Sequence, residues 1–433
     1  MRIAIVGGGV SGNVCAWLLH PDHDVTLFEA ADYLGGHTNT IEVQTFDAEY
    51  TVDTGFMVFN NQTYPQFIRL LELLGVPHQL SDMSFSVRCE RSGLEYQGSS
   101  LNGLFAQRLN LFNPRFYWML KDVLRFNRQA PRFLRLEDDV TTLGEYLTAK
   151  KYGSAFIQNY LIPMTAAIWS ARPHAVLEMP ARFLIAFFLN HGLLQAANHP
   201  PWRTISGGAR TYVKAIADLM PGRIRLNSPI ESVRRHSEHV VVKPVGSQEE
   251  TFDEVIFATH ADQTLRMLSD ATDQEKSVLG SFDYQRNMAV LHTDSSLLPL
   301  RKRAWASWNY HIPQSEDQPV AVTYDLNRLQ SLGAPAPICV TLNHVDQIDP
   351  SLILGQMEYE HPVFGSGTIE AQRAHRELNG RHRTHFCGAY WGYGFHEDGV
   401  RSALVVGESF GKTLESCTVA STTGSCDTVV SSQ

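Results

Sequence analysis

Residues 1–37 read MRIAIVGGGVSGNVCAWLLHPDHDVTLFEAADYLGGH, and this stretch decides the fold. The apolar run at residues 3–6 predicts a buried strand, residues 10–19 an apolar-periodic helix, and residues 25–28 a second strand that ends at Glu29. Gly7, Gly9 and Gly12 follow the first strand in the order G-x-G-x-x-G. On its own such a motif is often only a turn. Strand, glycine turn, helix, strand and acid together predict a βαβ unit that binds a dinucleotide.

The residue types of this unit suit a pyrophosphate and a ribose. Gly7 permits a tight turn, Gly9 lets the backbone approach the pyrophosphate, and Gly12 lets the helix pack closely on the strand. The free N–H groups and the positive dipole end of the helix favour phosphate charge. Glu29 stands about twenty residues on, where an acid accepts hydrogen bonds from a ribose hydroxyl. The neighbours predicted to share this binding site are Val10, Ser11 and Ala30.

Composition narrows the class of protein. The chain has 433 residues, enough for two or three domains, and its formal net charge of -9 argues against nucleic acid as a partner. The six cysteines form no C-x-x-C pair and the histidines no metal motif, so we expect reduced thiols and no metal site. No signal peptide is visible, and the longest apolar run, residues 183–189, is too short to span a bilayer. We therefore predict a cytoplasmic protein with a disordered tail at residues 416–433.

Residues 104–135 are unusually basic and aromatic for an acidic protein. They contain seven arginines and lysines, seven aromatic residues and a single acid, Asp122. Such a helical region can lie peripherally on an anionic membrane surface. It can equally be a solvated helix face whose aromatic residues belong to the core.

The residues after Glu29 carry a resemblance to a known family. Gly35 and Gly36 are followed by His37 and Thr38. This resembles the flavoprotein family of amine oxidases, phytoene desaturases and protoporphyrinogen oxidase, in which a glycine pair and an arginine follow the first βαβ unit. The resemblance implies FAD as the cofactor, with these four residues near its pyrophosphate. His37 stands where the family has arginine, which changes the charge at this contact.

The resemblance extends to three further parts of the predicted cofactor site. It implies that Gly55, Phe56 and Met57 face the flavin ring, although residues 55–59 could also be a plain core strand. It implies that Ile230 contacts adenine through its backbone. It also implies that a helix beginning near residues 398–399 points its N-terminus at the flavin pyrimidine. The residues predicted there are Gly388, Phe395, Gly399 and Val400.

The middle of the chain resembles the family's substrate domain. Residues 142–194 are mostly helical in pattern and resemble a helical cap, in which Phe183, Phe187 and Phe188 either line an apolar tunnel or fill the core. Many amine oxidases have a lysine that holds a water near the flavin. The rough equivalent here is His292, which weakens an amine-oxidase assignment.

Several segments resemble a narrower group. GGHTNT, VDTGFMVFNNQTYP, LSDMSFSV, NHGLL and YGFHEDG look like the bacterial flavoproteins linked with cyclopropane fatty acid synthases and the N-terminal domain of the plant synthases. The group implies a fatty acyl substrate, a role in lipid metabolism and a lipid-modifying enzyme as partner. His396 and Glu397 lie before the flavin helix, where a proton-handling group could reach the substrate. The alternative is that both residues serve as plain capping or hydrogen-bonded structure.

The sequence therefore predicts an α/β fold in which a Rossmann-like FAD-binding domain is interleaved with an α+β substrate domain. We assign residues 1–75, 200–265 and 381–415 to the FAD-binding domain and residues 76–199 and 266–380 to the substrate domain. The predicted activity is hydride removal from a hydrophobic substrate by a dehydrogenase, desaturase or isomerase. The alternatives are an amine or porphyrinogen-type oxidase and a non-catalytic flavoprotein partner.

Overall fold

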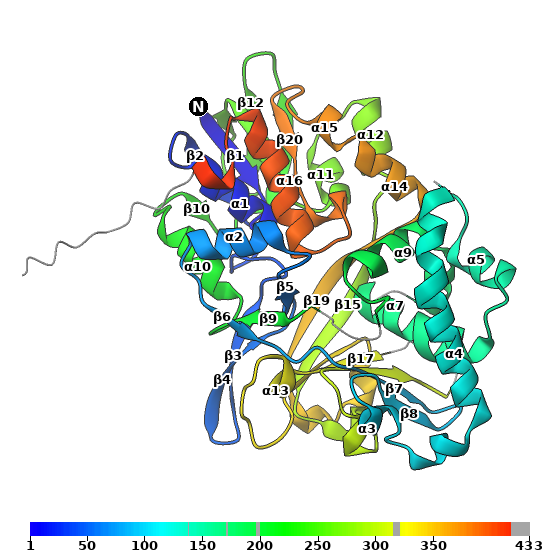
Figure 1. The fold of residues 1–433 in the computed structure, drawn as a ribbon. Helices are drawn as coiled ribbons and strands as arrows, with labels where there is room; N and C mark the ends of the chain where they lie inside the picture. Colours follow the sequence, from blue (N-terminus) through cyan, green and yellow to red (C-terminus); the bar gives the residue numbers. More distant parts are fainter. Residues whose placement is uncertain (137, 170–171, 196–199, 315–320, 417–433) are drawn as a thin grey trace, which may run out of the picture.

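The computed structural model describes residues 1–136, 138–169, 172–195, 200–314 and 321–416. A parallel five-stranded sheet of order β10-β2-β1-β14-β20 forms one end of the molecule (Figure 1). Its strands come from distant parts of the chain: β1 (Arg2–Val6), β2 (Asp24–Phe28), β10 (Ile224–Arg225), β14 (Glu254–Phe257) and β20 (Thr384–Phe386). This sheet confirms the predicted Rossmann-like α/β fold class.

Helix α1 (Val10–Leu19) has the predicted bounds and lies between the sheet and α16 (His396–Ser409). Its segment VSGNVCAWLL has no charged residue, so nine of its ten residues can be buried. Helices α2 (Pro65–Leu73) and α10 (Arg210–Asp218) pack on the same core. The other face of the sheet is covered by β11 (Ile230–Arg235), β12 (Val240–Pro244), β13 (Glu250–Phe252), α11 (Ala261–Met267) and α12 (Asp273–Leu279).

The second sheet has seven strands in the order β19-β15-β18-β17-β16-β7-β8. Within it only β16 and β7 pair in parallel, so its character is mainly antiparallel. Its strands are β7 (Phe85–Cys89), β8 (Leu94–Gln97), β15 (Asp283–His292), β16 (Trp308–Ile312), β17 (Ala321–Asp325), β18 (Cys339–Leu342) and β19 (Ile353–Val363).

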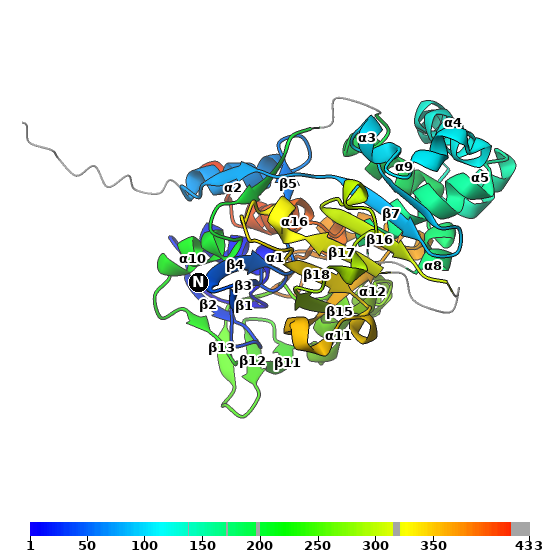
Figure 2. The ribbon, with the colours of Figure 1, turned by 90° about the horizontal axis from the view of Figure 1, so that it is seen from below.

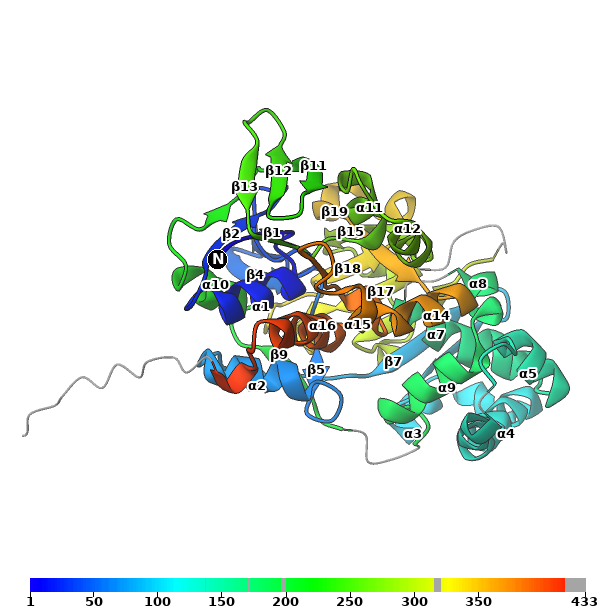
Figure 3. The same cartoon turned by 90° about the horizontal axis from the view of Figure 1, so that it is seen from above.

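A group of helices flanks this sheet at the end of the molecule away from α1 (Figures 2 and 3). Its members are α3 (Leu101–Leu104), α4 (Pro114–Gln129), α5 (Leu143–Ala149), α6 (Ser154–Phe156), α7 (Ile162–Trp169), α8 (Pro173–Glu178) and α9 (Ala181–Asn190). Pro163, which has no N–H to donate, lies near the start of α7, directly after a π-helical turn at Ile157–Leu161 that continues into α7.

Short strands connect the two ends of the molecule. A hairpin of β3 (Thr40–Thr45) and β4 (Ala48–Asp53) follows the first βαβ unit, and β9 (Trp202–Ile205) lies between β5 (Phe59–Asn60) and β6 (His78–Leu80). Every strand of the parallel sheet falls within the three segments assigned above to the FAD-binding domain. The exact domain boundaries stay a prediction.

Three further observations concern the cysteines, the helices and the C-terminal tail. Cys15, Cys89, Cys339 and Cys387 are free and buried. Among the described residues, no helix combines the length and apolar character needed to cross a bilayer. The tail predicted to be disordered lies outside the described residues from residue 417 onwards.

Candidate cofactor and substrate site

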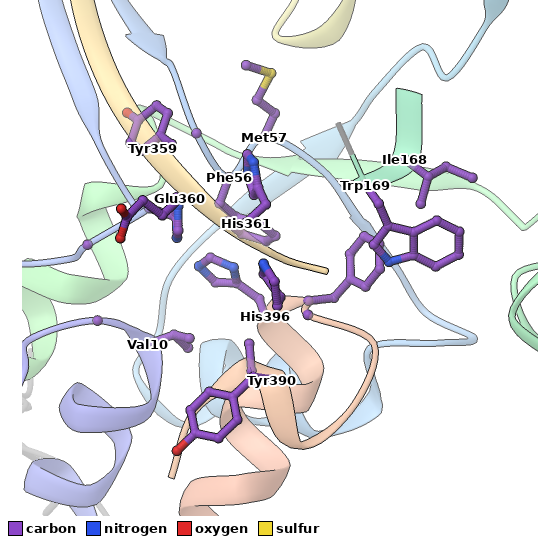
Figure 4. Close-up of a pocket in the computed structure, with 18 of the residues that line it drawn as sticks. Val10, Phe56, Met57, Ile168, Trp169, Tyr359, Glu360, His361, Tyr390 and His396 are labelled. Carbon is purple, nitrogen blue, oxygen red and sulfur yellow. The ribbon is translucent and has the colours of Figure 1, made fainter. Parts of the chain in front are cut away.

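A cavity of about 700 Å³ is lined by residues of the parallel-sheet end, the seven-stranded sheet and the helices beside it. One end contains the glycine turn before α1 and Glu29, and the other contains side chains of α7 and α9. Figure 4 shows His396 and Phe56 between Val10 and Trp169, which belong to these two ends. The cavity thus joins the predicted cofactor residues to the helices beside the second sheet.

The glycine turn leaves room for a phosphate at the start of α1. A Cβ on Gly9 would meet no atom within 4 Å, whereas one on Gly12 would overlap the carbonyl oxygen of Gly7. Gly7 itself has φ +105°, which disfavours any other residue. No side chain caps α1 and no acid occupies its first turn, so its N–H groups and dipole are available to an anion. These features fit the pyrophosphate of FAD.

Glu29 is held at the cavity wall, whereas two other residues predicted to contact the cofactor, Ala30 and Ile230, are not lining residues. Its carboxylate accepts hydrogen bonds from the N–H groups of Gly8 (2.7 Å) and Ala31 (2.8 Å). Ala30 is exposed, and neither it nor Ile230 lines the cavity. Ile230 is buried in the core on the other face of the sheet, although Ser228 nearby donates its N–H to the carbonyl oxygen of Glu29 (2.8 Å).

His37 belongs to a cluster of aromatic side chains rather than to a charged contact. Its ring centroid lies 5.3 Å from that of His361 and 6.3 Å from that of His260. Burial lowers the pKa of His37 well below its usual value and that of His361 to about 4, because a charged imidazole would lose its hydration. The residue that replaces the family's arginine is therefore neutral near pH 7.

The loop predicted to face the flavin ring does line the cavity. Gly55, Phe56 and Met57 are lining residues, and Phe56 donates its N–H to the carbonyl oxygen of His37 (2.8 Å). Residues 55–58 form no strand, since β5 begins at Phe59, so the alternative of a plain core strand is wrong for them. Gly35 and Gly36, both with positive φ, and Gly388 line the cavity as well.

His396 lies at the start of α16 and lines the cavity. Its Nε2 is 2.9 Å from the hydroxyl of Thr38, which is 2.8 Å from the hydroxyl of Tyr212. Its ring stacks on Phe56 with centroids 3.5 Å apart. Burial lowers the pKa of His396 to about 3, so the imidazole is neutral and only weakly basic. His396 can donate or accept a hydrogen bond here, but it is a poor general base at neutral pH. Thr38 supports it from behind and does not itself line the cavity.

The starts of α1 and α16 lie against each other although they are almost 390 residues apart. The Ser11 hydroxyl donates to the carbonyl oxygen of Gly399 (3.1 Å), and a Cβ on Gly399 would lie 2.5 Å from Cγ1 of Val10. The two helix N-termini therefore converge on one side of the cavity, where both can act on one bound cofactor.

The structure corrects the predicted contact from Gly399 and Val400. Helix α16 begins at His396, earlier than expected, because Asp398 caps it by accepting the N–H of Phe395 (3.0 Å). The N–H of Gly399 is consequently paired with the carbonyl oxygen of Phe395 (3.0 Å), and Val400 is fully buried a residue further on. The N–H groups left without helical partners are those of the first turn, beginning with His396.

For Glu397 the structure supports the capping alternative over proton handling. Its carboxylate accepts the N–H groups of Gln66 (3.2 Å) and Phe67 (2.9 Å) at the start of α2, and it does not line the cavity. It therefore acts as a cap for another helix, not as a proton-handling group at the site.

The other end of the cavity is apolar and was largely missed by sequence reasoning. Of the three phenylalanines proposed for a tunnel, Phe187 lines the cavity, whereas Phe183 and Phe188 belong to the core. Phe187 packs between Trp169 (4.6 Å between centroids) and Phe395 (5.3 Å) and so links α9 to the start of α16. The lining residues that no motif indicated include Met164, Ile168, Trp308, Tyr324 and Leu342.

The described lining residues of the cavity include none with a permanent positive charge. Among the described residues that line it there is no lysine or arginine. Burial lowers the pKa of His191 to about 4, as it does for His361, so these imidazoles are also neutral. His292, the rough equivalent of the family's lysine, is buried against Thr341 (2.7 Å) and is not a lining residue.

Comparison with known proteins gives a family and a fold. A family model described as flavin containing amine oxidoreductase matches residues 10–298. A curated relative, the flavin-containing amine oxidase B of Rattus norvegicus, is 23% identical over 263 residues, which are 57% of this chain and 48% of the relative. The chain thus spans about half the length of this relative.

Solved structures of similar fold cover nearly the whole chain. Putrescine oxidase bound to putrescine has a TM-score of 0.66 at 14% identity and covers 95% of this chain and 99% of its own. Cyclohexylamine oxidase from Brevibacterium oxydans gives 0.66 at 16% identity with the same coverage. A fatty acid isomerase from P. acnes that produces CLA gives 0.66 at 15% identity and covers 94% of this chain and 98% of its own. At these identities the likeness shows the fold alone.

Proposed function

The chain belongs to the family of flavin-containing amine oxidoreductases and is an FAD-dependent oxidoreductase; from this premise we propose that its substrate is a neutral fatty acyl chain. The reaction is the removal of a hydride from a C–H bond of that chain, as a dehydrogenase, desaturase or isomerase. When bound, FAD supplies the hydride acceptor.

The observation that carries this proposal is the apolar, uncharged wall at the α7 and α9 end of the cavity. Met164, Ile168 and Phe187 line it, and no lysine or arginine among the described lining residues offers a partner to a carboxylate. Burying an unpaired carboxylate is costly, whereas each buried methylene of an acyl chain contributes about 0.8 kcal/mol. A neutral acyl ester, such as a phospholipid tail, therefore suits the cavity better than a free acid held inside it.

The chain's own residues would hold FAD and orient the acyl chain against it. The start of α1 would hold the pyrophosphate and Glu29 the ribose, while the first turn of α16 would favour negative charge on the ring. Phe56 and the neutral His396 would support one side of the site, and the aromatic group of Trp169, Phe187 and Phe395 would exclude water from the other.

An amine substrate is the second candidate, because two carboxylates besides Glu29 line the cavity. Glu358 and Glu360 could attract an ammonium group, and the family contains amine oxidases. Arg286 lies 3.7 Å from the carboxylate of Glu358 and 3.2 Å from that of Glu360, so both already have a cationic partner. This pairing makes the acyl chain the better candidate. A lipid-modifying enzyme as partner, of the cyclopropane synthase kind, follows from the sequence resemblance and belongs to the same proposal.

Anaerobic mixing of the FAD-loaded protein with candidate substrates tests the proposal. Phospholipids with unsaturated or methylated acyl chains should bleach the flavin absorbance near about 450 nm, because the acyl chain reduces the cofactor. Ile168→Asn places an amide in the apolar wall and should slow this bleaching by about tenfold or more. Leu189→Asn, on the exposed side of α9, is the matched control and should bleach at the wild-type rate.

Two outcomes would overturn the acyl assignment. Bleaching by amines alone would favour the second candidate. Stable association with a lipid-modifying enzyme without bleaching by any lipid would leave a non-catalytic role.

A further inference from the structure

The outward surface of the segment from α3 to α4 combines large apolar side chains with unpaired basic ones. This segment includes the 3₁₀ turn η1 (Arg108–Phe112), which joins the two helices. It lies at the corner of the molecule away from α1 and α16, as Figures 1 and 3 show. We call the outward surface of residues 101–136 the cap face, and we propose that the cap face binds the surface of an anionic phospholipid bilayer.

Helix α4 separates its side chains into two faces. Phe116, Met119 and Phe126 point into the core and are buried. Trp118, Lys121 and Leu124 are exposed and follow one another at intervals of three residues, which places them on one outward stripe. The ammonium group of Lys121 lies 4.6 Å from the centre of the Trp118 ring. This alternation of apolar and basic side chains on one stripe is typical of helices that lie in a membrane interface.

The apolar side chains of the cap face are exposed to an extent that is rare for their type. Phe112 is 85% exposed, Leu109 75% and Trp118 62%. Eight of the twenty large hydrophobic residues exposed in the described chain fall between residues 101 and 136. Single exposed apolar residues need no explanation, but a concentration of this size marks a binding surface.

The aromatic residues of the segment divide between the two alternatives that the sequence left open. Phe116, Phe126 and Phe133 are buried, as a core interpretation requires. Phe112 and Trp118 are not, and the core interpretation gives no reason for them. In the proposed bound state, the exposed Phe112 and Trp118 would insert into the bilayer interface.

The charge of the cap face selects an anionic partner. Arg115, Arg128, Arg132 and Arg135 make no ion pair or hydrogen bond through their side chains within the described chain. Arg108 bonds only to Asn102 and to a carbonyl oxygen, so its charge is also uncompensated, whereas Arg125 is paired with Asp122 (3.1 Å). The formal net charge of the whole protein is -9, so the positive charge of this surface is opposite to the charge of the protein as a whole. Anionic lipid headgroups attract such a surface, and each lysine or arginine near them adds to the affinity.

A neighbouring turn extends the same surface. Leu300 is 76% exposed and is followed by the exposed Lys302 and Arg303 in η5 (Lys302–Ala304), which contacts α3. Two segments almost 200 residues apart thus present the same combination of an exposed leucine and basic side chains. The binding inference depends only on this surface; that the bilayer also supplies the acyl substrate rests on the proposed function.

Vesicle sedimentation of the full-length, FAD-loaded protein tests the inference without turnover. The protein should sediment with vesicles of equimolar phosphatidylcholine and phosphatidylglycerol, and at least about tenfold less with phosphatidylcholine alone, because the basic side chains need an anionic surface. Salt at about 0.5 M should weaken binding through screening.

Variants separate the apolar and the charged contributions. Leu109→Ser with Phe112→Ser should lower the vesicle-bound fraction about tenfold or more, and so should Arg115→Glu with Arg128→Glu. Leu80→Ser with Val245→Ser is the matched control, since both side chains are exposed elsewhere, and it should bind as the wild type does. Unchanged far-UV circular dichroism and flavin absorbance establish that each variant is folded.

Three results would overturn the inference. One is absence of sedimentation with anionic vesicles at low salt. Another is binding that the cap-face variants and the control variant reduce equally. The third is concentration-dependent self-association that the cap-face variants abolish while no vesicle binds, which would make the face an interface between copies of the chain. If the wild-type protein binds no anionic vesicles but is bleached normally by acyl esters, this inference is refuted and the proposed function still stands.

Discussion

Lowering the pH from about 7.5 to about 5.5 should destabilise the folded protein, because most of its buried imidazoles are held neutral. Burial lowers the pKa of one histidine to about 3 and of four others to about 4, against an ordinary value of 6.5. An imidazole of this kind takes up its proton at pH 5.5 only when the chain unfolds. Acid therefore favours the unfolded chain. The five residues are His191, His292, His361, His375 and His396.

The size of the effect follows from these pKa values. Each histidine costs about 1.4 kcal/mol at one pH unit below its unfolded pKa, so together they cost about 7 kcal/mol. Asp53 and Asp398 act in the opposite direction, because burial raises the pKa of each to about 7 and they are protonated at pH 5.5 only in the folded protein. Protonation of these two aspartates stabilises the folded protein by about 4 kcal/mol, so the free energy of unfolding falls by about 3 kcal/mol in total.

Urea unfolding of the FAD-loaded protein at the two pH values, followed by far-UV circular dichroism, measures this loss. His375→Gln is the informative variant, because His375 bonds the carbonyl oxygen of Phe386 (2.7 Å) outside the cavity and glutamine can donate the same bond. The variant should reduce the loss by about 1.4 kcal/mol, since one imidazole no longer titrates. Equal or greater stability at pH 5.5, or an unchanged loss in the variant, would show that the imidazoles are not held neutral.

Four further changes distinguish structural from functional roles at the site. Gly12→Ala should cost about 3 kcal/mol in denaturant unfolding, because its Cβ overlaps the Gly7 carbonyl oxygen. Gly9→Ala should unfold within about 0.5 kcal/mol of the wild type but bind FAD about tenfold more weakly in a spectral titration, since its Cβ points into the open space meant for phosphate. Glu397→Gln should lower stability by about 1 kcal/mol and leave the flavin reduction rate unchanged, because the carboxylate only caps α2. His396→Gln should alter the reduction rate but not the shape of its profile between about pH 6 and 9, because the pKa of His396 is about 3.

The first βαβ unit could be predicted from sequence because its signals are local. The apolar strand, the glycine spacing and the helical period all lie within residues 1–29, and α1 has the bounds expected from them. The approach of α16 to α1 could be expected only through resemblance to a family, since nothing in either segment points to the other. In the structure the two helices are joined by a hydrogen bond from the Ser11 hydroxyl to the carbonyl oxygen of Gly399.

Other parts of the site depend on partners that are distant in sequence. The start of α16 was misplaced because its capping residue, Asp398, lies inside the helix that it caps. A capping role for Glu397 was an open alternative, but the helix that it caps could not be identified, since that helix begins more than 300 residues earlier at Pro65. In α4 the helical period was visible, but which aromatic residues face the core is set by tertiary packing. The apolar wall is built by α7, α9 and strands of the second sheet, and no single motif contains it.

We propose that the bound cofactor faces an apolar cavity whose described lining residues offer no lysine or arginine to a carboxylate. The most direct test compares a fatty acyl methyl ester with the free acid of the same chain in anaerobic single-turnover reduction of the FAD-loaded protein. The ester should reduce the flavin at concentrations at least about tenfold lower than the free acid does, because binding of the acid leaves a buried carboxylate without a charged partner. A free acid that reduces the flavin at lower concentration than its ester would contradict the claim.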